Sequence, residues 1–395
     1  MTETLSTDLD QLGRAGAEAL RRQDHAGARA LFERVARARP TDANAWLGLA
    51  LACRGLGDDN GQFAALDRVL AADPGNLPAL LMKADFFARL GDGRAAGAFY
   101  RAVVERAGTL ETVPQELRDE ILRAERESNR YAQAYETHLR EALSKVGFDP
   151  VKSSARFSQS LDLLLGKKQI FFQSPSSFYF PELPQRQFYE RPEFPWLAEL
   201  EAKTDLIRDE LLGIVGDDSA FRPYVRSDGA RPPRAYGELL DSLEWSAFFL
   251  IESGSVNDAA AARCPRTMEA LRLAPLAEAP GRTPSVLFSL LRPGARIPPH
   301  TGYLNTRLIC HLPLIVPEGC GLRVGNEVRS WVEGETLIFD DTIEHEAWNT
   351  SATLRVVLLF DIWRPELFPD ERKLVAAALA AVDSYGTGAP AWNGR

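Results

Sequence analysis

The chain has 395 residues, which at ~150 residues per domain is enough for two or three domains that each bury a core. Hydrophobic residues make up 45% and charged residues 26% of the chain, a composition that is typical of globular proteins and excludes wholesale disorder. The 46 basic and 55 acidic residues leave a formal net charge of -9, so we do not expect a nucleic acid as partner.

Two further features bear on location and redox chemistry. The first residues lack the basic and apolar regions of a signal peptide, and no apolar run approaches the ~20 residues of a membrane-spanning helix. We therefore expect a cytoplasmic protein without a membrane span. The four cysteines are scattered and form no C-x-x-C pair, which predicts reduced thiols rather than disulfides or a cysteine zinc site.

The first hundred residues contain an internal repeat with the length of a tetratricopeptide helix pair. Pro40 recurs as Pro74, so the period is 34 residues, and Gly57 recurs as Gly91 at the same spacing. A third copy is marked by small and branched residues that return twice at this period: Ala30, Ala64 and Ala98; Val35, Val69 and Val103. Because proline ends helices and glycine permits tight turns, we expect a solenoid over residues 8–108. A plain helical bundle is the alternative, but it gives no reason for a fixed period.

Residues 109–170 are predicted to form a helical connector. The segment 114–146 is rich in Glu, Arg, Ala and Leu, and it lacks internal proline and glycine, which indicates a long helix that packs against the last repeat. The composition then changes to an aromatic and proline-rich passage, which includes Phe194-Pro195-Trp196 and marks a domain junction. One further helix is expected over residues 197–215.

Residues 171–395 are predicted to form a mostly β domain, so the fold class is multidomain α and β. Short segments separated by Gly, Pro and Asp turns read as antiparallel strands, which implies a sandwich or barrel, with a jelly-roll as first choice. The expected strands are residues 245–252, 285–292, 306–315, 321–324, 327–332, 336–340 and 355–363. A last helix is expected over residues 369–385.

Three of the five histidines, His300, His311 and His345, lie within one stretch of the β domain. Converging strands of a jelly-roll can bring His300 and His345 to one metal ion, because neutral imidazole is a common ligand of iron and zinc. Arg355 begins an apolar strand, where a buried guanidinium is costly without an anionic partner. This pattern favours a metal site beside a binding site for an anion such as a dicarboxylate.

The order of these residues resembles that of the aspartyl/asparaginyl β-hydroxylases, a family of iron(II)- and 2-oxoglutarate-dependent oxygenases. The resemblance covers roughly residues 178–365, and family members often carry an N-terminal tetratricopeptide region. Most such oxygenases open an H-x-D/E pair with the first ligand, whereas this chain has His300-Thr301-Gly302. Because this family binds iron through two histidines without a carboxylate, Gly302 is the residue that the resemblance predicts. The other matching motifs and residues are Ser289-Leu290-Leu291-Arg292-Pro293-Gly294, His311-Leu312, Asp341 to Trp348, and Arg355.

The resemblance implies a double-stranded β-helix core and a role for each matched residue. His300 and His345 would be the Fe(II) ligands, and Asp341 would be a catalytic group that holds metal-bound water. The cosubstrate 2-oxoglutarate would be bound at three further residues, its distal carboxylate by Arg355 and Ser289 and its other carboxylate by His311. The implied reaction consumes O2 and hydroxylates an unactivated carbon, in the first place the β-carbon of an Asp or Asn residue in a peptide or protein. Stacked helix pairs build a concave surface, so we expect the repeats to recruit this substrate, with a structural or dimerising role as the alternative.

Substrate recognition in this chain is expected to differ from that in the family's animal members. Those members carry a Lys and an Arg at the positions of Leu287 and Ile309, and both cations are associated with the acidic side chain that is hydroxylated. Their loss weakens selection for a carboxylate, unless Arg292, Arg296 or Arg307 compensates from nearby. A small-molecule or lipid-linked substrate is therefore an alternative.

Two other interpretations remain open at this point. The three histidines could instead form a zinc site with bound hydroxide, although that leaves Arg355 unexplained. The chain could also be a non-catalytic scaffold whose jelly-roll no longer binds iron, although both presumed ligands, His300 and His345, are present. Iron content and coupled succinate formation would separate the interpretations.

Overall fold

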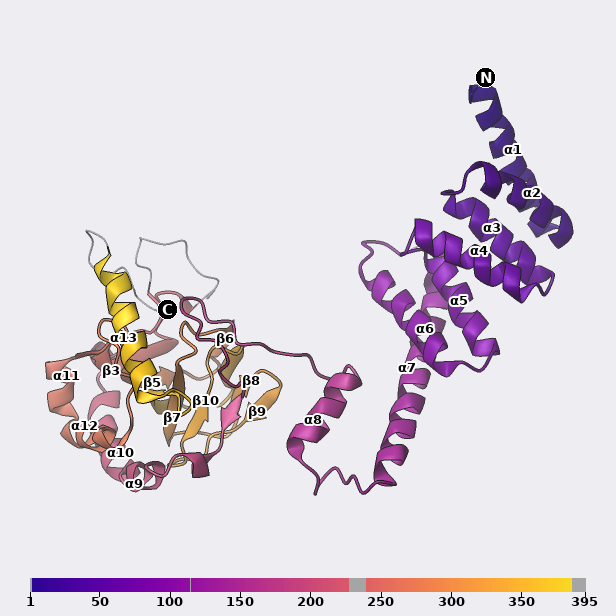
Figure 1. Cartoon of the computed structure of the whole chain (residues 1–395). Helices are drawn as coiled ribbons and strands as arrows, with labels where there is room; N and C mark the ends of the chain where they lie inside the picture. Colours follow the sequence, from indigo (N-terminus) through magenta and orange to yellow (C-terminus); the bar gives the residue numbers. More distant parts are fainter. Residues whose placement is uncertain (1, 114, 227–238, 386–395) are drawn as a thin grey trace. The chain divides into compact units, whose positions relative to one another are not determined.

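The computed structural model describes residues 2–113, 115–226 and 239–385. It divides the chain into two compact units, Met1–Lys167 and Lys168–Arg395, which are the indigo-to-magenta and magenta-to-yellow parts of Figure 1. The division lies close to residue 171, the predicted start of the β domain. Among the described residues, none of the helices combines the length and apolarity that a bilayer crossing requires.

The N-terminal unit is built from helices that follow the predicted period. The helices are α1 (Thr2–Arg21), α2 (His25–Ala38), α3 (Ala43–Gly55), α4 (Asp59–Ala72), α5 (Leu77–Arg89), α6 (Gly93–Gly108), α7 (Gln115–Ser144) and α8 (Ala155–Leu164). The first residues of α2, α4 and α6 stand at positions 25, 59 and 93, and those of α3 and α5 at positions 43 and 77. Each step is one repeat of 34 residues, so the helix pairs that the sequence predicts are confirmed.

The repeat is fixed locally by a turn followed by a helix cap. Gly57 and Gly91 have φ values of 69° and 74°, in the left-handed region that glycine adopts without strain, and Gln23 takes the same position in the first pair with φ 61°. An aspartate follows directly and caps the next helix, because its carboxylate accepts a backbone N–H three residues on. These caps are Asp24, Asp58 and Asp92.

The helices outside the repeats differ in part from the prediction. The long connector helix is present as α7, although Pro114, its predicted first residue, lies outside the described residues. The expected helix over residues 197–215 is in fact two helices, α9 (Leu197–Glu201) and α10 (Thr204–Val215), and Thr204 donates its hydroxyl to the Glu201 carbonyl at the break. α11 (Asp258–Arg263) and α12 (Pro265–Ala270) were not predicted, whereas α13 (Pro369–Ser384) was. Residues 386–395 lie outside the described residues.

The C-terminal unit contains two antiparallel sheets. The 8-stranded sheet has the order β1-β10-β7-β12-β5-β3-β2, with β4 paired to β3, and the 4-stranded sheet has the order β6-β11-β8-β9. The strands of the first sheet are β1 (Phe188–Tyr189), β2 (Arg222–Pro223), β3 (Trp245–Glu252), β4 (Ser255–Val256), β5 (Val286–Leu291), β7 (Arg307–Ile315), β10 (Leu337–Phe339) and β12 (Arg355–Trp363). Those of the second are β6 (Arg296–His300), β8 (Cys320–Val324), β9 (Glu327–Arg329) and β11 (His345–Asn349). The predicted β-rich domain behind a helical repeat region is confirmed.

The larger sheet is buried on both faces. One face packs on α10 through a cluster that includes Ile207 and Leu358, and the other packs on the smaller sheet through a cluster that includes Leu287 and Leu322. Every residue of β12 is buried as a result. Because side chains of a strand alternate between its faces, β12 sends every second residue towards the smaller sheet, starting with Arg355.

The sequence pattern did not predict β6 and β11, the two strands that carry the predicted metal ligands. β6 contains Pro298 and Pro299, which argue against a strand because proline cannot donate to the sheet. β6 nevertheless lies at the edge of the smaller sheet, where proline is tolerated. β11 is short and carries polar residues, so its pattern alone does not predict a strand.

Candidate active site

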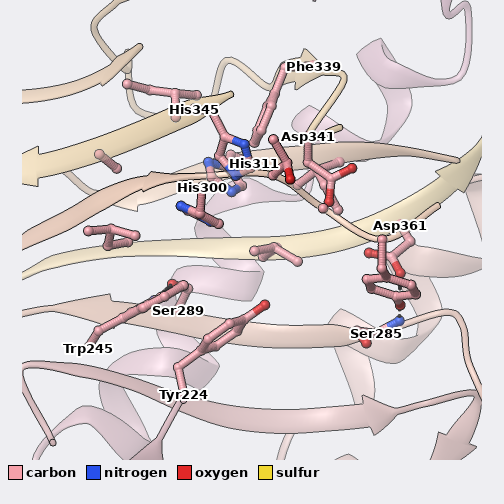
Figure 2. A pocket seen from close by; sticks show the side chains of 18 of the residues that line it. Tyr224, Trp245, Ser285, Ser289, His300, His311, Phe339, Asp341, His345 and Asp361 are labelled. Atoms are coloured by element: carbon pink, nitrogen blue, oxygen red, sulfur yellow. Dashed lines mark hydrogen bonds between the residues drawn. The ribbon is translucent and has the colours of Figure 1, made fainter. Parts of the chain in front are cut away.

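The six residues predicted as site residues line one cavity in the C-terminal unit, and Figure 2 labels all of them except Arg355. They come from both sheets and from the loop before β11. The larger sheet supplies one residue each from β5, β7 and β12, and the smaller sheet supplies the two histidines that were predicted as metal ligands. In chain order the six residues are Ser289, His300, His311, Asp341, His345 and Arg355.

His300 and His345 face each other across two paired strands. They are direct partners in the antiparallel register of β6 and β11, and their ring centroids are 4.0 Å apart. Cross-strand partners have their side chains on the same face of a sheet. The edge strand with its prolines therefore serves to hold one imidazole against the other.

The two imidazoles are also oriented in the same way. Nδ1 of His300 lies 2.8 Å from the carbonyl oxygen of Pro298, and Nδ1 of His345 lies 3.1 Å from that of Ile343. A carbonyl only accepts, so each Nδ1 carries the hydrogen and the lone pair sits on Nε2. Burial lowers the pKa of His300, and it lowers the pKa of His345 further with help from the neighbouring His300. Both rings are thus neutral, as metal ligation requires.

Gly302 lies against the carboxylate of Asp341. A Cβ atom at position 302 would lie 2.1 Å from Oδ2 of Asp341, which is far inside van der Waals contact. The same oxygen accepts a hydrogen bond of 2.8 Å from Arg307, while Oδ1 is buried and makes no hydrogen bond to a described residue. Asp341 therefore occupies the space that a side chain at position 302 would need.

Asp341 is a carboxyl group with an altered acidity. Burial raises its pKa to about 7, the carboxylates of Asp340 and Asp361 act in the same direction, and Arg307 opposes them. A carboxyl group with a pKa near neutrality can both accept and donate a proton under physiological conditions.

Arg355 is a buried cation without a carboxylate partner. It is 1% exposed, and among the described residues it forms no ion pair. Its Nη1 donates only a long bond of 3.5 Å to the carbonyl of Ser289, and its Nε has no partner in the described chain. Its guanidinium lies 5.0 Å from the centroid of the Trp331 ring, and burial lowers its pKa to about 10. An unpaired buried charge is costly, so this end of the cavity is suited to an anion.

Ser289 and His311 border the same end of the cavity. Oγ of Ser289 accepts a bond of 3.2 Å from the indole of Trp245, which leaves the hydroxyl hydrogen to donate elsewhere. His311 is packed against Phe339 and Trp331, and its Nδ1 makes no hydrogen bond to a described residue. Burial, followed by the charge of Arg355, holds the pKa of His311 well below its usual value.

The three histidines do not form the zinc site considered as an alternative. In the described parts of the chain, no group of three or more His, Cys, Asp or Glu side chains is arranged to hold a metal ion. The arrangement is a pair, His300 and His345, with His311 on the larger sheet.

Further residues of the cavity were not predicted as site residues. Asp361 and Arg307 are charged and buried, and the aromatic rings of Tyr224 and Trp245 stack with centroids 4.0 Å apart. A signal for Asp361 was available, because it is a charged residue in an apolar strand at an even spacing from Arg355. The aromatic pair has no comparable signal, because it depends on the pairing of strands.

Comparison with solved structures gives matches to helical repeat proteins. The type III secretion translocator chaperone SycD of Yersinia enterocolitica covers 33% of this chain and 88% of its own, with 14% identity and a TM-score of 0.30. A TPR2B domain of yeast Sti1, in complex with an Hsp70 peptide, covers 32% of this chain and 98% of its own, with 15% identity and a TM-score of 0.29.

Comparison with protein sequences identifies the C-terminal region. The aspartyl/asparaginyl beta-hydroxylases of mouse and human are each 37% identical over 183 residues, which is 46% of this chain but 23% of theirs. The ornithine lipid ester-linked acyl 2-hydroxylase of Rhizobium tropici is 36% identical over 182 residues, 45% of this chain and 60% of its own. The chain thus spans less than two thirds of these relatives. The model of the family described as aspartyl/asparaginyl beta-hydroxylase matches residues 201–365, which confirms the resemblance that the motifs of this region predict.

Proposed function

We propose that the C-terminal unit is an iron(II)- and 2-oxoglutarate-dependent dioxygenase that hydroxylates an unactivated carbon. The observation that carries the proposal is the meeting of two features in one cavity. These are a pair of neutral histidines with the same tautomer, and a buried arginine that lacks a carboxylate partner.

The residues present fit the iron ion that the resemblance to this family implies. Nε2 of His300 and of His345 would hold iron, and Oδ1 of Asp341 would accept a hydrogen bond from metal-bound water. The space beside Gly302, which a third protein ligand would need, is filled by the Asp341 carboxylate. When bound, iron(II) supplies the oxygen chemistry, in which O2 oxidises 2-oxoglutarate to succinate and CO2 and the second oxygen atom enters a C–H bond as hydroxyl.

The cavity residues at the cationic end would bind the cosubstrate. Arg355 would donate charge-assisted hydrogen bonds to the distal carboxylate, and the Ser289 hydroxyl would donate to the same group. His311 would approach the carboxylate nearer the metal. A dicarboxylate would thereby relieve the desolvated charge of Arg355, which explains why a buried arginine is retained without a protein partner.

The substrate that we propose is an Asp or Asn residue of a peptide or protein. The names of the mouse and human relatives support this class, while that of the Rhizobium relative supports a lipid-linked alternative. The N-terminal unit would recruit the peptide, because a groove lined by Leu9 and Gly13 of α1 and by Leu47, Gly48 and Leu51 of α3 runs along its helices.

The test is turnover with labelled oxygen. The protein, loaded with Fe(II) and 2-oxoglutarate, should form succinate under labelled O2 and transfer one labelled oxygen atom to a hydroxylated product. His345→Ala should abolish both, because it removes a ligand, whereas His138→Ala on the exposed surface of α7 should retain them. Succinate formation by His345→Ala at the wild-type rate, or none by the wild type, would contradict the proposal.

A further inference from the structure

The cavity is electrically polarised along one strand. β12 sends Arg355, Leu359 and Asp361 into the cavity, in keeping with the alternation of a strand. Arg355 and Asp361 are six positions apart in the strand, a span of about 20 Å at ~3.3 Å per residue. Since the cationic end is suited to the cosubstrate, the acidic end is left for the substrate.

The charge of the arginine at the acidic end is already neutralised. Nη1 of Arg307 donates to Oδ1 of Asp361 at 3.1 Å, and Nη2 donates to Oδ2 of Asp341 at 2.8 Å. The exposed fractions of Arg307, Asp361 and Asp341 are 4%, 1% and 6%, so water does not screen these charges. Two carboxyl groups share one guanidinium, so this end has no excess of positive charge.

Other arginines do not add a positive charge there. Among the described residues that line the cavity, Arg307 and Arg355 are the basic ones. The side chain of Arg296 is 64% exposed and pairs with Glu346 on the smaller sheet, and Arg292 does not line the cavity either. Among the described residues at this end of the cavity, a substrate carboxylate would therefore meet two carboxyl groups and no cation without a carboxylate partner, which disfavours its binding. The compensation by Arg292, Arg296 or Arg307 that the sequence left open has no support in this arrangement.

One hydrogen-bonding group at this end is left for a substrate. Nε of Arg307 is a buried donor without a hydrogen-bond partner in the described chain, whereas Oδ1 of Asp341 is the acceptor proposed for metal-bound water. A primary carboxamide offers its oxygen to this donor and brings no negative charge to the two carboxyl groups. A carboxylate also accepts but adds a negative charge, and an ammonium only donates.

We infer that the acidic end receives a carboxamide, so that the proposed hydroxylase acts on asparagine in preference to aspartate. This inference rests on the proposed function and narrows its substrate class. Asparagine and aspartate have nearly the same shape, so the selection is one of charge and hydrogen bonding rather than of size.

The test uses binding rather than turnover. The whole chain is loaded with Zn(II), which is not redox-active, and with 2-oxoglutarate, whose binding is first confirmed by calorimetry without peptide. Three peptide pools with random flanks and one fixed central residue, Asn, Asp or 2,4-diaminobutyrate, are then passed over the immobilised protein and measured by mass spectrometry. Enrichment of the Asn pool at least tenfold over each of the others is the expected result.

The outcomes separate the two claims. Failure of 2-oxoglutarate to bind overturns the proposed function together with this inference. Bound 2-oxoglutarate with equal retention of the Asn and Asp pools, preference for Asp or for 2,4-diaminobutyrate, or retention of none, as with a lipid-linked substrate, overturns the inference alone.

A matched pair of variants tests the cause of the preference. Asp361→Asn removes one of the two carboxylates that share Arg307, so the ratio of Asn to Asp retention should fall at least tenfold. Asp383→Asn removes a carboxylate that pairs with the buried Arg282 and does not line the cavity, so the ratio should stay as in the wild type. An unchanged ratio in folded Asp361→Asn overturns the inference, and if that variant does not fold, the wild-type ratio decides.

Discussion

At the residue scale, the space beside Gly302 is too small for a side chain. A side chain there collides with the Asp341 carboxylate, which Arg307 and the surrounding burial hold in place. We predict that Gly302→Ala lowers the free energy of unfolding by ~1–3 kcal/mol, as overpacking does in other cores. Chemical denaturation measures this change.

The control for this prediction is Gly213→Ala, in α10. A Cβ at position 213 meets no atom within 4 Å, and alanine favours a helix over glycine by up to ~1 kcal/mol. The control should be neutral or stabilising. Equal effects of the two substitutions would show that the contact with Asp341 does not restrict position 302.

Arg355 should affect binding and stability with opposite signs. Arg355→Met removes an unpaired buried charge, so the free energy of unfolding of the ligand-free protein should rise by roughly 1–4 kcal/mol. The free energy of 2-oxoglutarate binding should become less favourable by roughly 2–5 kcal/mol, because a charge-assisted contact is lost. Thermal unfolding and calorimetry measure the two effects. A purely structural role would instead lower stability and leave the affinity unchanged.

The buried histidines should make stability dependent on pH. The pKa of His311 is held well below its ordinary value of 6.5 in the folded protein, so below pH 6.5 the unfolded state binds a proton that the folded state does not. Stability is therefore lost as the pH falls. His311→Leu should remove up to one proton from this dependence, a slope of ~1.4 kcal/mol per pH unit. The free energy of unfolding is measured as a function of pH for both proteins. Parallel curves for the wild type and the variant between pH 6.5 and 5 would contradict this prediction.

At the level of elements, the repeat depends on caps that act independently of packing. Asp92 accepts the backbone N–H of Ala95 at the start of α6. Asp92→Ala should lower stability by ~1 kcal/mol, while Asp92→Asn, which keeps the acceptor, should cost only a fraction of this. Equal losses in the two variants, measured by thermal unfolding, would assign the effect to charge rather than to capping.

The elements also show what the sequence could predict and why. β3 and β12 were predicted with their observed bounds, because each is a continuous apolar run that is buried on both faces. β6 and β11 were not, because an edge strand with prolines has no apolar pattern, and its existence depends on the partner strand. The order of the histidines and the arginine along the chain was enough to predict the residues of the site. The common tautomer of the two histidines and the pairing of Arg307 with two carboxyl groups depend on the fold, so the sequence could not predict them.

At the scale of the whole molecule, the division at residues 167 and 168 predicts separable functions. A protein that starts at Lys168 should fold, bind metal and bind 2-oxoglutarate as the full chain does, because the described residues that line the cavity all lie beyond that point. Turnover of a peptide substrate should weaken, if the N-terminal groove recruits it as proposed. Full loss of 2-oxoglutarate binding in a folded truncation would show that the N-terminal unit belongs to the site.

In the proposed enzyme, one cavity holds a metal on two histidines and a dicarboxylate on a buried arginine. The most direct measurement is calorimetric binding of 2-oxoglutarate to the protein with Fe(II) in the absence of oxygen. The wild type should bind one equivalent in a metal-dependent way, and His345→Ala and Arg355→Met should each weaken the binding at least tenfold. Binding of equal strength without metal, or unchanged binding in both variants, would contradict a shared site for the metal and the dicarboxylate.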